Sequence, residues 1–406
     1  MSDVFCPAPF VHFYNRGTSS GRLCCIAKGK IIHSKSAEDT WSSTKYKNVR
    51  QNLLDNKAIS ECQPCYDQEK LGNTSDRLYY VNKFEKNYKT KFNIDTGNNN
   101  SKPVDLDLRL SNLCNLGCRM CGPHFSSVLE KDAKVLPELA EKYNWEGQEP
   151  NQMLTDEDIN WLINNNRNLR RIKFLGGEPT IMNEMYKILD MVIENKLQPI
   201  ITITTNCTNV NKRFIEYLKY FKESTINMSL DGFGPTIEYI RHPANFPTIE
   251  KNANIISELA TDVNVNFVVQ AYNIHNLDDF ITWISKNKKI RTVNSVIVHT
   301  PRGTSPFYLP IEYRKPFLEK ALNNKNIDNK IFNKLKNQIL HIYNSKEELP
   351  MYEFLKLTLI FDEHRNQHLF KLTPELKKYV VEHIASIGKS SIIKPRFVKH
   401  YIEKNY

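Results

Sequence analysis

The chain has 406 residues, of which 40% are hydrophobic and 25% are charged, with a formal net charge of +11 at pH 7. This composition is typical of a folded globular protein and argues against a disordered or fibrous one. The longest apolar runs, such as residues 263–269, are too short and too often interrupted to span a bilayer, so we expect no membrane partner.

The lysines are scattered along the chain, and no arginine-rich or aromatic-interleaved run is present. A nucleic-acid partner is therefore not favoured. The largest excess of positive charge lies in residues 311–406, where 18 Lys and Arg stand against 11 Asp and Glu. The N-terminal decapeptide lacks the basic start and apolar stretch of a secretory signal, which predicts a cytoplasmic location and reduced cysteines.

Residues 1–92 are predicted to form a small module stapled by a metal, with weak helical signals at 45–57. In a reducing compartment, clustered cysteines indicate metal ligands before disulfides. The polar, glycine-containing segment 93–102 is predicted to be a linker. The cysteines of this module are Cys6, Cys24, Cys25, Cys62 and Cys65.

Residues 103–305 alternate strand and helix patterns. Helices are expected after Thr155, with Asp158 placed for a capping box, and near 184–196, 212–222, 249–260 and 277–288. Strands alternating with helices of this length predict a parallel sheet with right-handed crossovers, and six such units predict an open, partial (β/α)6 barrel. The strands are predicted at 104–110, 170–177, 199–206, 226–232, 263–273 and 295–301.

Residues 306–406 are predicted to be a helical C-terminal extension. Apolar residues recur at heptad spacing in 331–343, and Thr373-Pro374-Glu375 is a candidate helix start. No residue in this extension shows recognisable chemistry.

Three cysteines, Cys114, Cys118 and Cys121, form a CxxxCxxC loop directly after the first predicted strand of the barrel. Three thiolates in one short loop can ligate three irons of a cubane cluster and leave the fourth iron open. The alternative is a zinc site, for which His124 would supply a fourth ligand.

This loop resembles the signature of the radical S-adenosylmethionine (SAM) superfamily, and further motifs follow in that family's order. The resemblance implies that the three cysteines hold a [4Fe-4S] cluster and that Glu178 binds the SAM amino group. Ser229 and Arg241 match positions near the SAM carboxylate or ribose, although Arg241 could equally be a surface arginine. The glycines would let the backbone pass close to a ligand. The SAM-binding residues implied in this way are Gly176, Gly177, Glu178, Asn206, Ser229 and Arg241.

The same resemblance implies the chemistry. One electron from the reduced cluster, supplied by a flavodoxin- or ferredoxin-type donor, would cleave SAM, and the 5′-deoxyadenosyl radical would take a hydrogen atom from the substrate. No catalytic residue is assigned. Cys207, which follows Asn206, is either a reactive thiol or a small buried hydrophobe.

The N-terminal cysteines resemble those of a SPASM or twitch module, which follows the barrel in most relatives but precedes it here. The resemblance implies one auxiliary [4Fe-4S] cluster, with a zinc tetrathiolate site as the alternative. Its ligands would be Cys6, Cys24, Cys62 and Cys65, with Cys25 as an alternative to Cys24.

Three functions are compatible with these patterns. The first is a radical SAM enzyme that modifies a peptide or protein, or oxidises a small alcohol or sugar. The second is a zinc-stabilised nucleic-acid-binding protein that uses its basic C-terminal region. The third is a radical SAM enzyme that acts on RNA or a nucleoside.

Overall fold

The computed structural model describes residues 4–15, 21–29, 32, 34–85, 102–143, 145, 154–327 and 330–387. Residues 86–92, most of the predicted linker at 93–102 and residues 388–406 lie outside this described part of the chain. None of the helices within it is long and apolar enough to cross a membrane.

The chain divides into two compact units. The first consists of Met1–Leu113, Glu149–Thr204 and Lys212–Thr225, and the second of Cys114–Gln148, Thr205–Asn211 and Ile226–Tyr406.

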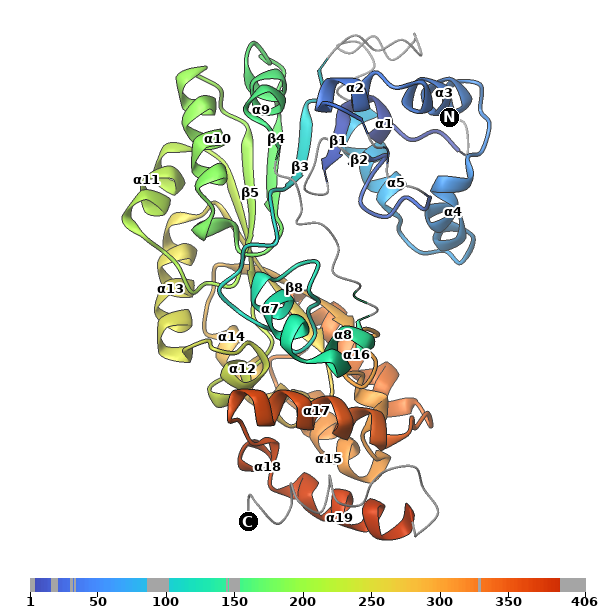
Figure 1. Cartoon of the computed structure of the whole chain (residues 1–406), viewed down its shortest axis with the longest axis vertical. Helices are drawn as coiled ribbons and strands as arrows, with labels where there is room; N and C mark the ends of the chain where they lie inside the picture. The colour runs from blue at the N-terminus through green and yellow to red at the C-terminus, as the bar shows by residue number, and fades with distance from the viewer. Residues whose placement is uncertain are drawn as a thin grey trace. The chain divides into compact units, whose positions relative to one another are not determined.

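A mainly parallel sheet forms the centre of the first unit, with strands in the order β2-β1-β3-β4-β5 (Figure 1). β1 pairs with β2 in antiparallel fashion, and the other neighbouring pairs are parallel. The α/β class with a parallel sheet is thus as predicted, but β1 was not expected. The strands are β1 (His12–Asn15), β2 (Gly21–Arg22), β3 (Asp105–Arg109), β4 (Arg171–Leu175) and β5 (Ile200–Thr205).

One face of β3 and β4 is polar. The register places Asp105 opposite Arg171 and Asp107 opposite Lys173. Arg171 Nη2 lies 2.8 Å from Asp105 Oδ2, and Lys173 Nζ lies 3.1 Å from Asp107 Oδ2. Burial alone would raise the pKa of Asp105, but the neighbouring Arg171 guanidinium holds that pKa well below its usual range. The opposite face of β4 is buried and apolar.

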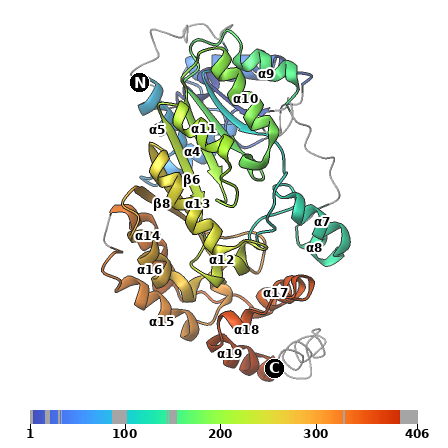
Figure 2. The same cartoon turned by 90° about the vertical axis from the view of Figure 1, so that its left-hand side faces the viewer.

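Helices of the first unit surround this sheet (Figures 1 and 2). The capping box predicted at Thr155 is confirmed, because its side chain accepts from Asp158 N while the Asp158 side chain accepts from Thr155 N. The helices are α1 (Ala8–Val11), α2 (Ala37–Trp41), α3 (Thr44–Leu54), α4 (Gln63–Lys70), α5 (Asp76–Tyr80), α9 (Asp156–Ile163), α10 (Asn183–Glu194) and α11 (Lys212–Tyr220), with the short turns η1 (Ser60–Cys62), η2 (Val81–Glu85) and η3 (Pro179–Ile181).

The second unit holds the last parallel strand pair, β7 (Asp262–Val269) and β8 (Ile290–Ile297). The boundary between the units falls inside β6 (Ser224–Ser229), whose continuation at Leu230 donates to Asn266 O of β7 at 3.1 Å. All six strands predicted at 104–301 therefore exist, although β8 begins five residues before the predicted strand.

The helices of the second unit include a group from the C-terminal part of the chain, of which α15 and α16 pack side by side (Figures 1 and 2). They are α7 (Ser127–Val135), α8 (Pro137–Lys142), α12 (Pro235–Ile240), α13 (Phe246–Leu259), α14 (Leu277–Ser285), α15 (Ile311–Leu322), α16 (Asn333–Asn344), α17 (Met351–Arg365), α18 (Leu369–Leu372) and α19 (Glu375–Ile387), with the short turns η4 (Ile274–Asn276), η5 (Pro306–Tyr308) and η6 (Lys330–Phe332).

Candidate active site

The CxxxCxxC loop lies in the second unit, where hydrogen bonds fix its backbone at Cys114, Leu116 and Gly117. Ser127 Oγ donates to Cys114 O and accepts from Cys114 N, both at 3.1 Å. Ser126 Oγ donates to Leu116 O at 2.7 Å and also caps α7. Further along, Gly117 N donates to His242 O at 2.7 Å. The loop is therefore a positioned element rather than a free surface turn.

The three cysteines of the loop differ in exposure. Cys118 is buried, and Cys114 and Cys121 are half-buried. Leu116 N approaches Cys114 Sγ at 3.5 Å, and Arg241 Nη1 approaches Cys118 Sγ at 3.7 Å. Burial raises the pKa of Cys118, and the Arg241 charge opposes that rise. An N–H donor beside Cys114 and a positive charge beside Cys118 suit thiolate ligands of an iron–sulfur cluster.

His124, the fourth ligand of the zinc alternative, lies three residues after Cys121. The ring of His124 lies edge-on to Phe125, with ring centroids 6.3 Å apart. In the described part of the chain, no three His, Cys, Asp or Glu side chains are arranged to hold a single metal ion.

A buried ion pair anchors the middle of the cysteine loop. Arg119 and Asp362 of α17 are both fully buried and form an ion pair. Arg119 Nε also donates to Tyr239 O at 3.1 Å, and its guanidinium carbon lies 3.8 Å from the Tyr239 ring centroid. Asp362 accepts a further hydrogen bond from the Tyr239 hydroxyl at 2.7 Å. Sequence reasoning missed this contact, because nothing in residues 306–406 suggested a partner for the loop.

Arg241 belongs to a second buried ion pair. Its Nε donates to Asp231 Oδ2 at 2.8 Å, and Asp231 Oδ1 accepts from Val268 N at 2.7 Å. Arg241 is only 7% exposed, so the alternative of a surface arginine is wrong. Its contacts are with Asp231 and Cys118, and its predicted role toward SAM stays a prediction.

Asn206 joins the end of β5 to the cysteine loop. Its Nδ2 donates to Asn115 Oδ1 at 3.0 Å, and its Oδ1 accepts from Thr208 N at 2.9 Å. Asn115 Nδ2 in turn donates to Thr208 Oγ1 at 2.7 Å, which closes the network. Neither Asn115 nor Thr208 was singled out from the sequence, although Asn115 lies between two of the loop cysteines.

Ser229 and Cys207 lie at the ends of β6 and β5. Ser229 is half-buried, and no side-chain hydrogen bond links it to another described residue. Cys207 is fully buried, with a positive φ of 62°, and its carbonyl accepts from Asn252 Nδ2 at 2.8 Å. A positive φ is unusual for a residue with a Cβ, so the turn after Asn206 is strained.

In the first unit, Gly176 and Gly177 pass against the chain's own backbone. A Cβ on Gly176, whose φ is +122°, would lie 2.4 Å from Ser111 O, and one on Gly177 would lie 2.0 Å from Leu113 O. Gly177 N donates to Ser111 O at 2.9 Å. These two positions require glycine because their backbone lies close to the backbone of residues 111–113. The sequence had instead suggested that the glycines lie close to a ligand.

Glu178 is buried directly after these glycines. Its N donates to Leu113 O at 2.8 Å, and its Oε1 accepts from Thr180 N at 3.2 Å and from Thr180 Oγ1 at 2.7 Å. The carboxylate thus caps η3. Its orientation is set by this cap, and its predicted contact with the SAM amino group stays a prediction.

Four of the five N-terminal cysteines line a single pocket, together with Asp76, Arg77 and Tyr80. Burial raises the pKa of Cys24 and of Cys62 to about 12, and the charges of neighbouring cysteines raise both further. Thiolates at these positions would repel one another, which favours the protonated thiols. The four are Cys6, Cys24, Cys62 and Cys65.

Cys25 has a different environment. Its side chain is exposed and lies outside the lining of that pocket, and its Sγ donates to Asp76 Oδ2 at 3.4 Å. Cys24, and not Cys25, therefore belongs to the pocket that Cys6, Cys62 and Cys65 line.

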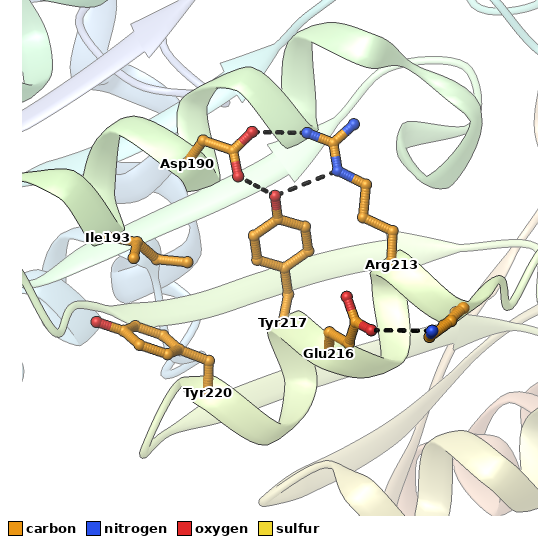
Figure 3. A pocket seen from close by; sticks show the side chains of 7 residues that line it. Asp190, Ile193, Arg213, Glu216, Tyr217 and Tyr220 are labelled. Carbon is orange, nitrogen blue, oxygen red and sulfur yellow. Dashed lines mark hydrogen bonds and ion pairs between the residues drawn. The ribbon is translucent and has the colours of Figure 1, made fainter.

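A separate surface pocket lies on α10 and α11 of the first unit (Figure 3). Asp190, Arg213 and Tyr217 bond to one another across it, with Arg213 Nη2 2.6 Å from Asp190 Oδ2. Lys212 pairs with Glu216 at 4.0 Å. Because these charged groups satisfy one another and the pocket lies on helices rather than at strand ends, we do not assign it a ligand.

Comparison with known proteins identifies the class. Residues 108–284 match the family model of the Radical SAM superfamily. The chain therefore contains a radical SAM domain, which is the domain of a superfamily of enzymes, and the matched segment includes the cysteine loop and every predicted SAM-binding residue.

Individual relatives are distant. The chain is 24% identical over 184 residues to a protein described as probable GTP 3′,8-cyclase from Methanocaldococcus jannaschii, covering 43% of this chain and 53% of that protein. It is 26% identical over 179 residues to GTP 3′,8-cyclase from Alkaliphilus oremlandii, covering 43% and 50%. The chain thus spans about half the length of the curated relatives it matches.

Solved structures show weaker likeness. Native anSMEcpe with bound AdoMet is 17% identical with a TM-score of 0.40, covering 60% of this chain and 61% of that chain. Streptococcus suis SuiB bound to precursor peptide SuiA is 15% identical with a TM-score of 0.33, covering 86% and 70%.

Proposed function

We propose that this protein is a radical SAM enzyme that holds a [4Fe-4S] cluster through Cys114, Cys118 and Cys121 and cleaves SAM reductively. The observation that carries the proposal is the cysteine loop itself. It lies inside the segment that matches the superfamily, the Leu116 N–H faces Cys114 Sγ, and the Arg241 guanidinium faces Cys118 Sγ. When bound, the cluster and SAM together supply the radical that takes a hydrogen atom from the substrate.

The chain's own residues would bind and orient the cofactors. Glu178 is proposed to bind the SAM amino group. Arg241 would balance the negative charge of the thiolate at Cys118, since its guanidinium is buried beside that sulfur. Ser229 offers a hydroxyl without a partner among the described residues, and Asn206 ties the β5 end to the loop. The remaining proposed SAM-site residues, Gly176 and Gly177, shape the turn that presents Glu178.

The N-terminal module is proposed to be a twitch-like module that carries an auxiliary [4Fe-4S] cluster. Support comes from the single pocket lined by Cys6, Cys24, Cys62 and Cys65. Four thiolates would ligate every iron, so this cluster would relay electrons or hold the module in shape rather than bind SAM. A zinc ion in the same pocket is the alternative.

We also propose three domains for the chain, with the limits that the sequence predicts. They are a module at 1–92, a partial (β/α)6 barrel at 103–305 and a helical extension at 306–406. The protein would work in the cytoplasm with a flavodoxin- or ferredoxin-type electron donor.

For the substrate, we propose a peptide or protein, or a small alcohol or sugar, as in enzymes with SPASM and twitch modules. A nucleotide or nucleoside is the second candidate, because the curated relatives bear the name GTP 3′,8-cyclase. Incubation of the reconstituted enzyme with GTP and SAM, followed by mass spectrometry, separates the two classes.

The experiment that tests the proposed function is anaerobic reconstitution followed by assay of SAM cleavage. The wild-type protein should produce 5′-deoxyadenosine and methionine under reducing conditions, and Cys118→Ala should produce neither. Cys207→Ala is the matched control, since it removes another buried cysteine of the same unit and should retain cleavage. Unchanged cleavage in Cys118→Ala refutes the assignment. Zinc without iron in the wild-type protein would favour the zinc-stabilised nucleic-acid-binding alternative.

A further inference from the structure

We infer that Arg365, on the C-terminal helix α17, is a positioning residue that makes the cluster proposed at Cys114, Cys118 and Cys121 easier to reduce. The inference rests on the proposed function. It concerns a residue outside the segment that matches the superfamily, because that segment ends at residue 284.

Arg365 touches the backbone of the cysteine loop. A Cβ on Gly117 would lie 2.7 Å from Arg365 Nη2 and 3.0 Å from Val128 Cγ1. Gly117 is the residue before Cys118, so the guanidinium occupies the space that a side chain in the loop would fill. Any larger residue at position 117 would have to displace this charge.

The packing around Arg365 fixes its position. Leu357 and Phe361 of α17 are fully buried in a cluster with Leu129 and Leu139, and Cys121 packs against this cluster. The Arg365 guanidinium lies over the Phe361 ring, 4.1 Å from its centroid. α17 is thus part of the support of the cysteine loop.

The charge on Arg365 is buried and only partly compensated. Its side chain is 3% exposed, and its Nη2 donates to Asp132 Oδ2 at 2.9 Å. Asp132 Oδ1 lies 3.1 Å from His364 Nε2. Arg365 Nη1 is buried without a hydrogen-bond partner in the described part of the chain. A buried cation acts strongly on nearby charge because little water screens it.

The electrostatic consequence has a definite sign. Reduction would add one electron, and hence one negative charge, to a cluster held by Cys118, the residue that follows Gly117. Arg365 therefore favours the reduced form, and Asp132 opposes it.

The test is an anaerobic redox titration of the full-length reconstituted protein. The titration is monitored by electron paramagnetic resonance. The signal measured is that of the cluster whose spectrum changes when SAM is added. Arg365→Gln should lower the reduction equilibrium constant about tenfold, which for a one-electron couple is about 59 mV toward more negative potential. Arg365→Lys should stay near the wild-type value, and Asp132→Asn should shift the potential in the positive direction.

Opposite shifts distinguish an electrostatic role from a merely structural one. Arg213→Gln, which removes an exposed arginine of the first unit that also pairs with an aspartate, should leave the potential unchanged. Shifts in the same direction for Arg365→Gln and Asp132→Asn, or none in either, would overturn the inference. If Arg365→Gln loses its iron, the reduction potentials of Arg365→Lys and Asp132→Asn are compared instead. An Asp132→Asn protein with the wild-type potential would then overturn the inference. A wild-type protein without any SAM-sensitive cluster would instead refute the proposed function.

Discussion

The ion pair between Arg119 and Asp362 offers a sharp test of how the cysteine loop is supported. Both side chains are fully buried. Asp362→Ala would leave the Arg119 charge buried without its main partner, and removing one member of a buried ion pair costs about 3–5 kcal/mol. For a unit of 150–250 residues, 1 kcal/mol shifts the Tm by about 2–4 °C, so the expected loss is about 6–20 °C.

The assay is thermal unfolding of the reduced apoprotein followed by circular dichroism. Asp190→Ala is the matched control. Asp190 and its partner Arg213 are each 47% exposed, and such surface pairs contribute about 0–1 kcal/mol. The combined change of Arg119→Met and Asp362→Leu should recover most of the loss, because an apolar pair leaves no buried charge. A Tm change below about 2 °C for Asp362→Ala would refute the reasoning.

Three further predictions concern other sites. Glu178→Ala should weaken SAM binding, measured by equilibrium dialysis, while the iron content stays at the wild-type level. Thr180→Val removes the hydroxyl that donates to Glu178 and should weaken SAM binding much less. Loss of iron in Glu178→Ala would count against its role. The double change Cys62→Ala and Cys65→Ala should lower iron from about eight to about four per chain while SAM cleavage persists; a wild-type protein with four irons and one zinc would disprove the auxiliary cluster. Burial lowers the pKa of His275 from 6.5 to about 4. As the pH falls, the unfolded chain therefore takes up this proton before the folded chain does. The free energy of unfolding should decrease as the pH falls from about 6.5 to 4. His275→Gln should make unfolding midpoints less dependent on pH in that window, and an unchanged slope would contradict this.

The six strands between residues 104 and 301 were predictable because each has a local signal. β4 and β7 alternate buried and partly exposed residues along their length, which is the pattern that a half-buried strand requires. β1 had no such signal, since its four residues are all buried and too few to show a period. Its place beside β3 depends on pairing across more than 90 residues, which local patterns do not encode.

Residues of the proposed site could be singled out where they cluster in the sequence, whereas charged residues that meet only in the folded chain could not. The cysteine loop and Glu178 follow from motifs. The partners of Arg119 and Arg365, however, come from helices that carry no motif, at separations above 230 residues. Gly176 shows a third case, in which the residue was identified but its close neighbour is the backbone at Ser111.

The central claim is that the cluster held by Cys114, Cys118 and Cys121 is the one that binds SAM. The most direct measurement is the electron paramagnetic resonance spectrum of the reduced protein carrying Cys62→Ala and Cys65→Ala, recorded with and without SAM. We predict a [4Fe-4S] signal that changes when SAM is added, because the three-cysteine loop leaves one iron open to it. A protein without a cluster signal, or a signal that SAM leaves unchanged, would contradict the account.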